Sequence, residues 1–316
     1  MSGTGRARTL IVLLFLVTEQ EDGLSIQYFT EENSVECVLM RMDQCKNARF
    51  KEVMTSVITH LHAVVKEVEP TVEEWAEAIQ FLTDTGKICD DRRQEFILMS
   101  DTLGVSMLVD AINHRKPSGA TENTVLGPFH VAGAPKRQMG DNICLDGKGE
   151  ALHMSGRVVD IHGMPISGAF LDIWHSNEDG FYDVQQPGIQ PDFNLRGLFQ
   201  TGPDGRYWFR SVKPRYYPIP TDGPVGKMLM MMGRHPFRPA HIHFIVGAKG
   251  YVPVTTHVFV RGDTYLESDA VFGVKDSLII DFVRHDDERE AKKLGVGNPF
   301  YVAKQDFVLM KAANGG

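Results

Sequence analysis

The segment at residues 238–246, RPAHIHFIV, decides the fold class of the second half of the chain. Alternate side chains of a β-strand share one face, so His241 and His243 would point the same way. The residues between and after them, Ile242, Phe244 and Val246, would form a purely apolar opposite face. The alternation predicts a half-buried strand that packs one face on the core and presents two imidazoles on the other.

Further segments with a period of two surround this strand. They are GRVVDI, AFLDIWH, RYWFRSV, TTHVFVRG and DSLIIDFV, separated by clusters of Gly, Pro, Asp and Asn. Several short strands at such spacing predict an antiparallel sandwich or barrel.

The chain before this region has a helical period instead. Apolar residues recur every three or four positions over residues 50–68, and Pro70 ends that helix. Thr71 and Glu74 form a capping box that begins a second helix, expected to end near Gly86. The side chains expected to be buried on it are Trp75, Ile79 and Leu82. A third helix is expected over residues 92–114, apolar on most sides and therefore buried.

The segment KPSGATENT, residues 116–124, separates the two patterns. We therefore predict an α+β protein, with a helical N-terminal region followed by an antiparallel β-sandwich. The predicted division is an N-terminal extension of unclear role at residues 1–27, the helical region at residues 28–120 and the sandwich at residues 121–316.

Composition excludes several classes of protein. Lys plus Arg number 33 and Asp plus Glu number 41, so the net charge is 33 − 41 = −8. An acidic chain lacks the basic surface of a nucleic-acid binder and the charge needed to dock on anionic lipid. Four cysteines without a C-x-x-C pair are typical of a protein from a reducing compartment.

The N-terminus carries a short apolar run, LIVLLFLV at residues 10–17, behind Arg6 and Arg8. This pattern is similar to a signal peptide, but no cleavage site of small residues follows it. The run is also too short to cross a bilayer. A dispensable extension or an extra packing segment is favoured, and we expect the protein in the cytoplasm.

The paired imidazoles suit iron, zinc, copper or nickel, although two buried histidines held by hydrogen bonds are the simpler interpretation. A cupin site would need a Glu where Gly247 and Ala248 stand, and a three-histidine zinc site would need His257 from another strand. Tyrosines in loops at strand ends are further ligand candidates. They are Tyr182, Tyr216 and Tyr217. Two phenolates with two imidazoles would select iron(III), because a hard oxygen anion prefers a highly charged cation.

At this point the sequence resembles the intradiol ring-cleaving dioxygenases, in the branch of catechol and hydroxyquinol 1,2-dioxygenases. The resemblance covers roughly residues 28–310. The matching segments are FILMSDTLGVSMLVDAINH, TVLGPFH, LDIWHSNEDGFYD, FNLRG, YPIPTDGPVG and GRHPFRPAHIHF. The order and spacing also match: Tyr182, then 35 residues to Tyr217, 24 to His241 and 2 to His243.

The resemblance implies one iron(III) per subunit, held by Tyr182, Tyr217, His241 and His243. Tyr217 would be the ligand that leaves when the substrate binds, and Arg238 would face that substrate. His257 stands where many catechol enzymes have glutamine. The family also implies a homodimer formed through the N-terminal helices, often with a phospholipid in a helical channel at the interface.

The implied reaction cleaves a 1,2-dihydroxybenzene with O2 between its hydroxyl-bearing carbons. The pocket segments resemble the hydroxyquinol branch more than the catechol branch, and Asp101 could accept a hydrogen bond from the third hydroxyl of hydroxyquinol. Local pairing of Asp101 within its helix is the alternative. The residues expected to line the pocket are Leu98, Asp101, Val125, Leu126, Gly127, Pro218, Ile219, Pro220, Thr221, Arg238 and His257. A non-catalytic β-sandwich binding module is the remaining alternative, and it would need neither the tyrosines nor the histidines.

Overall fold

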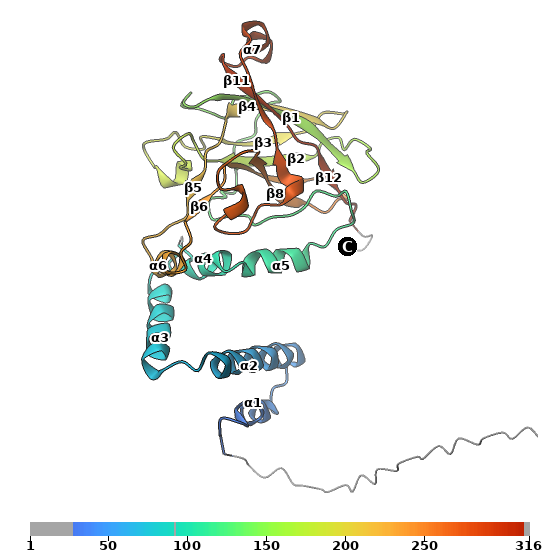
Figure 1. Cartoon of the computed structure of the whole chain (residues 1–316). Coiled ribbons are helices and arrows are strands. Elements are labelled where there is room, and N and C mark those ends of the chain that lie inside the picture. Colours follow the sequence, from blue (N-terminus) through green and yellow to red (C-terminus); the bar gives the residue numbers. More distant parts are fainter. Residues whose placement is uncertain (1–27, 92, 313–316) are drawn as a thin grey trace, which may run out of the picture. The chain divides into compact units, whose positions relative to one another are not determined.

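The computed structural model describes residues 28–91 and 93–312, which form two compact units that divide between Ala78 and Ile79. The first unit contains α1 (Ser34–Leu39), the 3-10 turn η1 (Met40–Met42) and α2 (Ala48–Val68). Helix α3 (Val72–Lys87) runs across the division (Figure 1). The expected α+β order of a helical region followed by sheets is confirmed.

The predicted capping box is present at the start of α3. The backbone N–H of Thr71 donates to Glu74 Oε2 at 2.8 Å, and the N–H of Glu74 donates to Thr71 Oγ1 at 3.2 Å. The expected burial on this helix is wrong, because Trp75, Ile79 and Leu82 are all exposed. A helical period predicts an apolar face, but it does not say which surface covers that face.

The prediction of a single helix over residues 92–114 is also wrong. Two helices, α4 (Glu95–Thr102) and α5 (Val105–Asn113), are separated at Leu103 and Gly104. Gly104 has a φ of 75°, a left-handed conformation that ends a right-handed helix. The apolar side chains of this segment are mostly exposed rather than buried; they include Ile97, Leu108 and Ile112.

Two five-stranded sheets follow in the second unit. One contains β10 (Phe282–His285), β11 (Phe300–Lys304), β1 (Ala151–Asp160) and β12 (Phe307–Leu309), with β4 (Arg206–Val212) also paired to β1. The other has the order β3 (Arg196–Gln200), β2 (Phe170–His175), β7 (His241–Gly247), β8 (Val254–Val260), β9 (Ile279–Ile280). A small ribbon pairs β5 (Tyr217–Pro218) with β6 (Phe237–Arg238).

The purely antiparallel expectation needs correction, because β1 pairs in parallel with β11 and β12, and β8 pairs in parallel with β9. The period of two predicts which faces are buried, but it carries no information on strand direction. The segment DSLIIDFV is likewise not one strand. It forms the turn η4 (Asp276–Leu278), β9 and β10.

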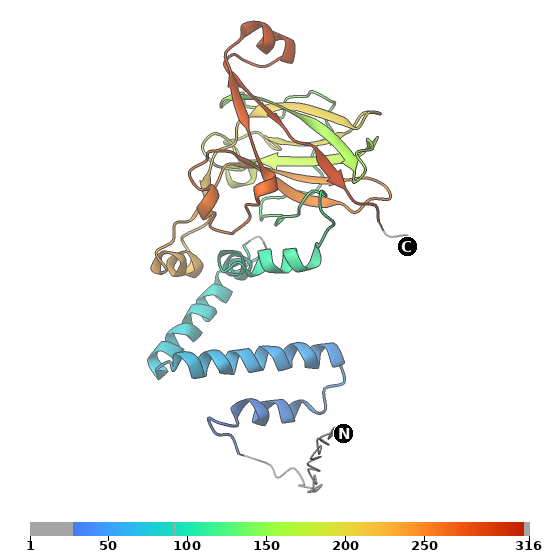
Figure 2. The ribbon, with the colours of Figure 1, turned by 45° about the vertical axis from the view of Figure 1, so that its right-hand side comes forward.

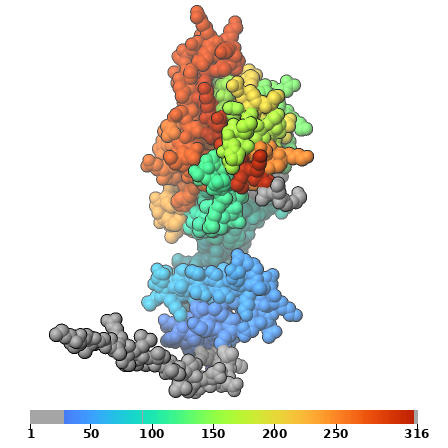
Figure 3. Space-filling view, turned by 90° about the vertical axis from the view of Figure 1, so that its right-hand side faces the viewer, coloured from blue at the N-terminus to red at the C-terminus, as the bar shows by residue number. Residues whose placement is uncertain are grey.

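The main core lies between the two sheets. The three residues expected on the core face of β7, Ile242, Phe244 and Val246, are all fully buried there. A smaller core joins α4, α6 (Pro224–Met231) and the segment after η3 (Leu266–Ser268), through Leu98, Leu229 and Val271. Figure 2 shows these helices along one side of the sheets, and α7 (Glu288–Leu294) at the opposite end. The projection of α7 is visible in Figure 3.

No helix in residues 28–91 and 93–312 is long and apolar enough to cross a membrane. The apolar run at residues 10–17 lies outside the described residues.

Candidate metal centre

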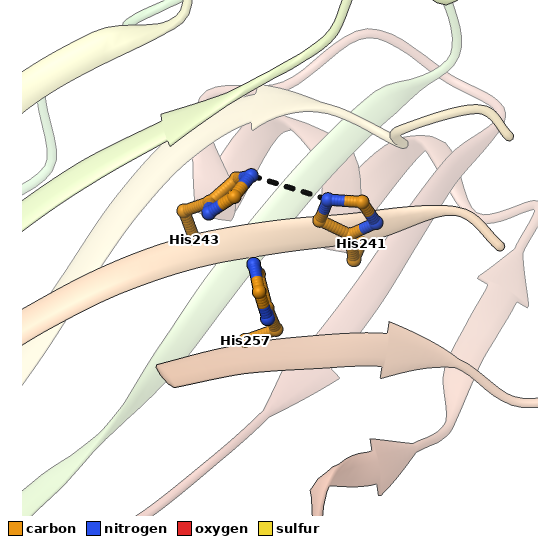
Figure 4. A group of neighbouring side chains, drawn as sticks. All are labelled: His241, His243 and His257. Atoms are coloured by element: carbon orange, nitrogen blue, oxygen red, sulfur yellow. Dashed lines mark hydrogen bonds between the residues drawn. The ribbon is translucent and has the colours of Figure 1, made fainter. Parts of the chain in front are cut away.

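Strand register places a row of aromatic rings on the face of β7 opposite the core. His243 lies directly across from Trp174 of β2 on one side and from His257 of β8 on the other. The rings of Trp174 and His243 stack with their centroids 4.6 Å apart. Figure 4 shows His241, His243 and His257 gathered over the two neighbouring strands β7 and β8. The alternation of a strand therefore brings both predicted imidazoles to one surface.

Tyr182 reaches the same surface from the loop between β2 and β3. Asn177 shapes this loop, because its side-chain oxygen accepts hydrogen bonds from the N–H groups of Asp179 and Phe181. The residue after the tyrosine, Asp183, forms a buried ion pair with Arg196 at 2.6 Å. These contacts fix the loop on the sheet and direct the buried Tyr182 ring inward.

Tyr217 comes from the β5–β6 ribbon, where it lies directly opposite Arg238. Gly180 makes its position possible. A Cβ at Gly180 would lie 2.9 Å from Tyr217 Cβ, and the φ of Gly180 is +85°. Only glycine fits both requirements at this turn. The neighbouring Tyr216 packs against Phe237 and Tyr265.

The four predicted ligand atoms converge. Tyr182 Oη lies 3.0 Å from His243 Nε2 and 3.3 Å from Tyr217 Oη. His241 Nε2 lies 3.1 Å from His243 Nε2 and 3.5 Å from Tyr217 Oη. Ligands at about 2.0–2.2 Å from one ion are separated by roughly 2.8–3.6 Å when they are adjacent in its coordination shell. The spacing therefore fits a single first-row metal ion.

The protonation of these groups also suits a metal. Burial lowers the pKa of His241 well below its ordinary value, and the charge of Arg238 adds to this effect. His241 Nδ1 lies 2.7 Å from the carbonyl oxygen of Pro239, so Nδ1 carries the proton and Nε2 presents its lone pair. Burial raises the pKa of Tyr182 well above its ordinary value. Only a close, highly charged cation would hold such a buried phenol as phenolate.

His257 forms a three-histidine group with His241 and His243, and this group is more widely spaced than the four tyrosine and histidine atoms. Its ligand atom and those of His241 and His243 lie within 4.8 Å of one another. His257 Nδ1 lies 2.5 Å from Thr124 Oγ1, and its buried Nε2 has no hydrogen-bond partner among the described residues. The tighter tyrosine–histidine spacing favours two tyrosines and two histidines over a three-histidine zinc site.

Arg238 lies next to the four atoms. It is buried, and its Nη1 lies 3.4 Å from His241 Nε2 and 3.5 Å from Tyr217 Oη. Burial is the largest influence and opposes its charge, but the carboxylate of Asp269 together with the oxygens of Tyr217 and Tyr182 more than offsets it and raises the pKa of Arg238. The guanidinium therefore stays charged beside the site.

The charge of Arg238 also acts on Asp101, which lies at the end of α4. Burial raises the pKa of Asp101, whereas the hydroxyl of Ser106 and the charge of Arg238 oppose that rise. One turn earlier, Leu98 packs on the small core that contains Ile219. Leu98, Asp101 and Ile219 therefore lie in the part of the second unit formed by α4, α6 and the β5–β6 connection.

The other residues expected in the pocket lie in two loops. Val125 is half-buried and Leu126 is exposed, while Gly127 packs against the ring of His243. Pro218 and Pro220 are exposed, and Thr221 is half-buried with its backbone against Gly226.

Several residues at the site were missed from the sequence. Phe129 stacks on Tyr182 at a centroid distance of 4.6 Å, and Trp174 stacks on His243. Asp269 and Arg196 form buried ion pairs next to the predicted groups. Trp174 could have been found from its place in the AFLDIWH strand. Phe129 and Arg196 could have been found from the segments TVLGPFH and FNLRG, whereas the loop that carries Asp269 has neither a period nor a quoted motif.

Gly127→Ala should displace His243. The new Cβ would lie 3.0 Å from His243 Cε1, at a φ of +78°. We expect a loss of about 1–3 kcal/mol in unfolding free energy and weaker metal retention, measured by denaturation and by metal content after dialysis. Gly133→Ala is the matched control, because Gly133 has a φ of +84° with nothing within 4 Å. Equal metal retention in the two variants would contradict the expectation.

Comparison with known proteins agrees with this geometry. A family model described as Dioxygenase matches residues 125–309, and one described as Catechol dioxygenase N terminus matches residues 47–121. A hydroxyquinol 1,2-dioxygenase of Rhizobium sp. strain MTP-10005 is 60% identical over 93% of this chain and 99% of its own length. A 6-chlorohydroxyquinol 1,2-dioxygenase of Cupriavidus pinatubonensis is 50% identical over 83% of this chain and 95% of its own.

A solved structure of hydroxyquinol 1,2-dioxygenase from Pseudomonas putida DLL-E4 superposes with a TM-score of 0.85 at 47% identity, covering 89% of this chain and 99% of that chain. Together with the two family models, which cover most of the described residues, these relatives establish the family. The chain belongs to the intradiol ring-cleavage dioxygenases, in the branch that contains the hydroxyquinol and catechol 1,2-dioxygenases.

Proposed function

We propose that this protein is a hydroxyquinol 1,2-dioxygenase that holds one iron(III) per subunit. The observation that carries the proposal is the convergence of two tyrosine oxygens and two imidazole nitrogens within 3.0–3.5 Å of their neighbours. The proposed ligands are Tyr182, Tyr217, His241 and His243. The relatives that match nearly the whole chain act on hydroxyquinols and support the choice of substrate.

The proposed reaction cleaves 1,2,4-trihydroxybenzene with O2 to 3-hydroxy-cis,cis-muconate, which tautomerises to maleylacetate. When bound, the iron(III) supplies a Lewis acid for the two adjacent hydroxyl oxygens of the substrate. Tyr217 Oη accepts one of the protons that the diol must lose. Arg238 Nη1, 3.5 Å from Tyr217 Oη, would donate to the negative charge that develops on the oxygens of the bound diol.

Asp101 is proposed to accept a hydrogen bond from the third hydroxyl. Asp101→Ala should reduce the preference for hydroxyquinol over catechol by about tenfold to a hundredfold, the value of a hydrogen bond to a charged group. The measurement is kcat/KM for both diols. Ser106→Ala is the control, because it removes the local partner of Asp101, along with the 2.8 Å contact between Ser106 Oγ and Ser100 Oγ, and leaves the carboxylate in place. If both variants keep the wild-type ratio, Asp101 has a local structural role.

The proposed pocket consists of the residues expected from the sequence: Leu98, Asp101, Val125, Leu126, Gly127, Pro218, Ile219, Pro220, Thr221, Arg238 and His257. The proposed division of the chain is the one expected from the sequence: an N-terminal extension at residues 1–27, a helical region at residues 28–120 and a catalytic sandwich at residues 121–316. We also propose a cytoplasmic location, because the four cysteines are free, as is usual in a reducing compartment.

A homodimer formed by the N-terminal helices is part of the proposal. Helix α2 buries none of its residues within the described chain, and exposes Leu61, Val64 and Val68. Apolar faces of this size are typical of surfaces that meet another molecule. A phospholipid at that interface would cover part of the same face. Sedimentation and lipid extraction of the purified protein test the two statements separately.

The deciding experiment measures oxygen uptake by the purified, iron-loaded protein with hydroxyquinol and catechol side by side. Strong preference for hydroxyquinol supports the proposal. Preference for catechol, with cis,cis-muconate as product, keeps the iron chemistry and makes the protein a catechol 1,2-dioxygenase. A colourless protein without uptake on either diol supports a non-catalytic binding module.

A further inference from the structure

The ion pair behind Arg238 suggests a role for a residue outside the proposed ligand set and pocket. Asp269 lies directly after η3, and its side chain is as deeply buried as that of Arg238. Asp269 Oδ1 accepts a hydrogen bond from Arg238 Nε at 3.1 Å, and Oδ2 accepts one from Arg238 Nη2 at 3.4 Å. The carboxylate therefore meets one edge of the guanidinium with both oxygens.

The backbone holds this carboxylate in place. Oδ1 also accepts from the N–H of Val271 at 3.2 Å, and Oδ2 from the N–H of Gly273 at 2.9 Å. Each oxygen thus has one partner on Arg238 and one on the chain that follows Asp269. A Cβ at Gly273 would lie 2.9 Å from Arg238 Nη2 and 3.1 Å from Asp269 Oδ2. The segment 269–273 closes tightly around the ion pair.

The remaining nitrogen of the guanidinium faces the site. Because Nε and Nη2 are occupied by Asp269, only Nη1 is directed at Tyr217 Oη and His241 Nε2. A planar guanidinium that is held along one edge cannot rotate its other nitrogen away. The orientation of Nη1 therefore depends on Asp269, although Asp269 itself has no hydrogen bond to the four convergent atoms.

We propose that Asp269 is a positioning residue that sets the direction of Arg238 Nη1 toward Tyr217 Oη and the bound diol. This inference rests on the proposed function. It assigns to Asp269 an effect on turnover and on the electronic state of Tyr217, beyond the stabilisation that any buried ion pair provides.

The test compares Asp269→Asn with wild type as purified holoenzyme. The substitution keeps the size of the side chain but removes its charge, and it turns one acceptor into a donor facing Arg238 or the backbone. We expect iron content close to wild type, kcat about tenfold to a hundredfold lower with a smaller change in KM, and a shifted tyrosinate-to-iron absorption band. Misplacement of a catalytic group by about 1 Å has effects of this size.

Glu95→Gln is the matched control. Glu95 is also a buried carboxylate that accepts from an arginine, Arg93, and from a backbone N–H, that of Val225. The Glu95→Gln variant should be less stable than wild type but have the wild-type kcat and absorption band. If Asp269→Asn behaves like Glu95→Gln in both readouts, the pair has only a structural role and the inference is overturned.

Gly273→Ala provides a second route if Asp269→Asn does not fold. Its Cβ would push on Nη2 while the carboxylate remains, so it should shift the band and lower kcat in the same direction. Unchanged kcat and band in that variant would also overturn the inference. A wild-type protein that is colourless and consumes no oxygen would instead contradict the proposed function, which separates the two failures.

Discussion

Tyr182→Phe should strongly reduce the visible colour of the iron-loaded protein, leaving only the absorption due to Tyr217, and lower turnover by more than about a hundredfold. The substitution removes one oxygen from the four-atom group and leaves the ring that stacks on Phe129. Without that phenolate, an ion in the site loses a strong anionic ligand and the charge-transfer absorption that goes with it. The measurements are iron content per subunit, the visible spectrum and kcat with hydroxyquinol.

Tyr207→Phe is the control for this variant. Tyr207 is equally buried on β4, and its hydroxyl donates to the carbonyl oxygen of Gln305 at 2.8 Å, within the main core. Its loss should cost about 1 kcal/mol of stability without changing colour or activity. A Tyr182→Phe protein that retains full activity would remove Tyr182 from the ligand set.

Arg238→Ala should retain iron and colour but lower kcat by about 10²–10³-fold, the usual effect of deleting a donor aimed at developing negative charge. The variant should also lose about 3–5 kcal/mol of unfolding free energy, because Asp269 is then left as an unpaired buried charge. Denaturation curves and turnover under saturating diol measure the two effects separately.

The double variant Arg238→Ala, Asp269→Ala distinguishes stability from catalysis. Removing both charges should recover much of the lost stability, whereas turnover should stay low. If turnover recovers together with stability, Arg238 acts through folding alone. Unchanged turnover in the single variant would exclude Arg238 from the mechanism.

Local patterns in the sequence were sufficient for much of the fold. The alternation in RPAHIHFIV predicted the buried face of β7 and the shared face of His241 and His243, because the side-chain period of a strand is fixed by its backbone. The capping box at Thr71 and Glu74 was equally local. The apolar helix at residues 92–114 was misread, because the break at Gly104 and the exposure of its side chains depend on what surrounds the helix.

By itself, the sequence determined the order of helices and strands, the face that carries the histidines, and the family through its motifs and their spacing. Only the tertiary structure decided that Tyr182 and Tyr217 approach the histidines, which requires Gly180 to let two loops pack together. It also decided that β11 and β12 run parallel to β1, and that Asp269 holds Arg238. These features join residues distant in the chain, and such contacts depend on packing and loop closure rather than on any local period.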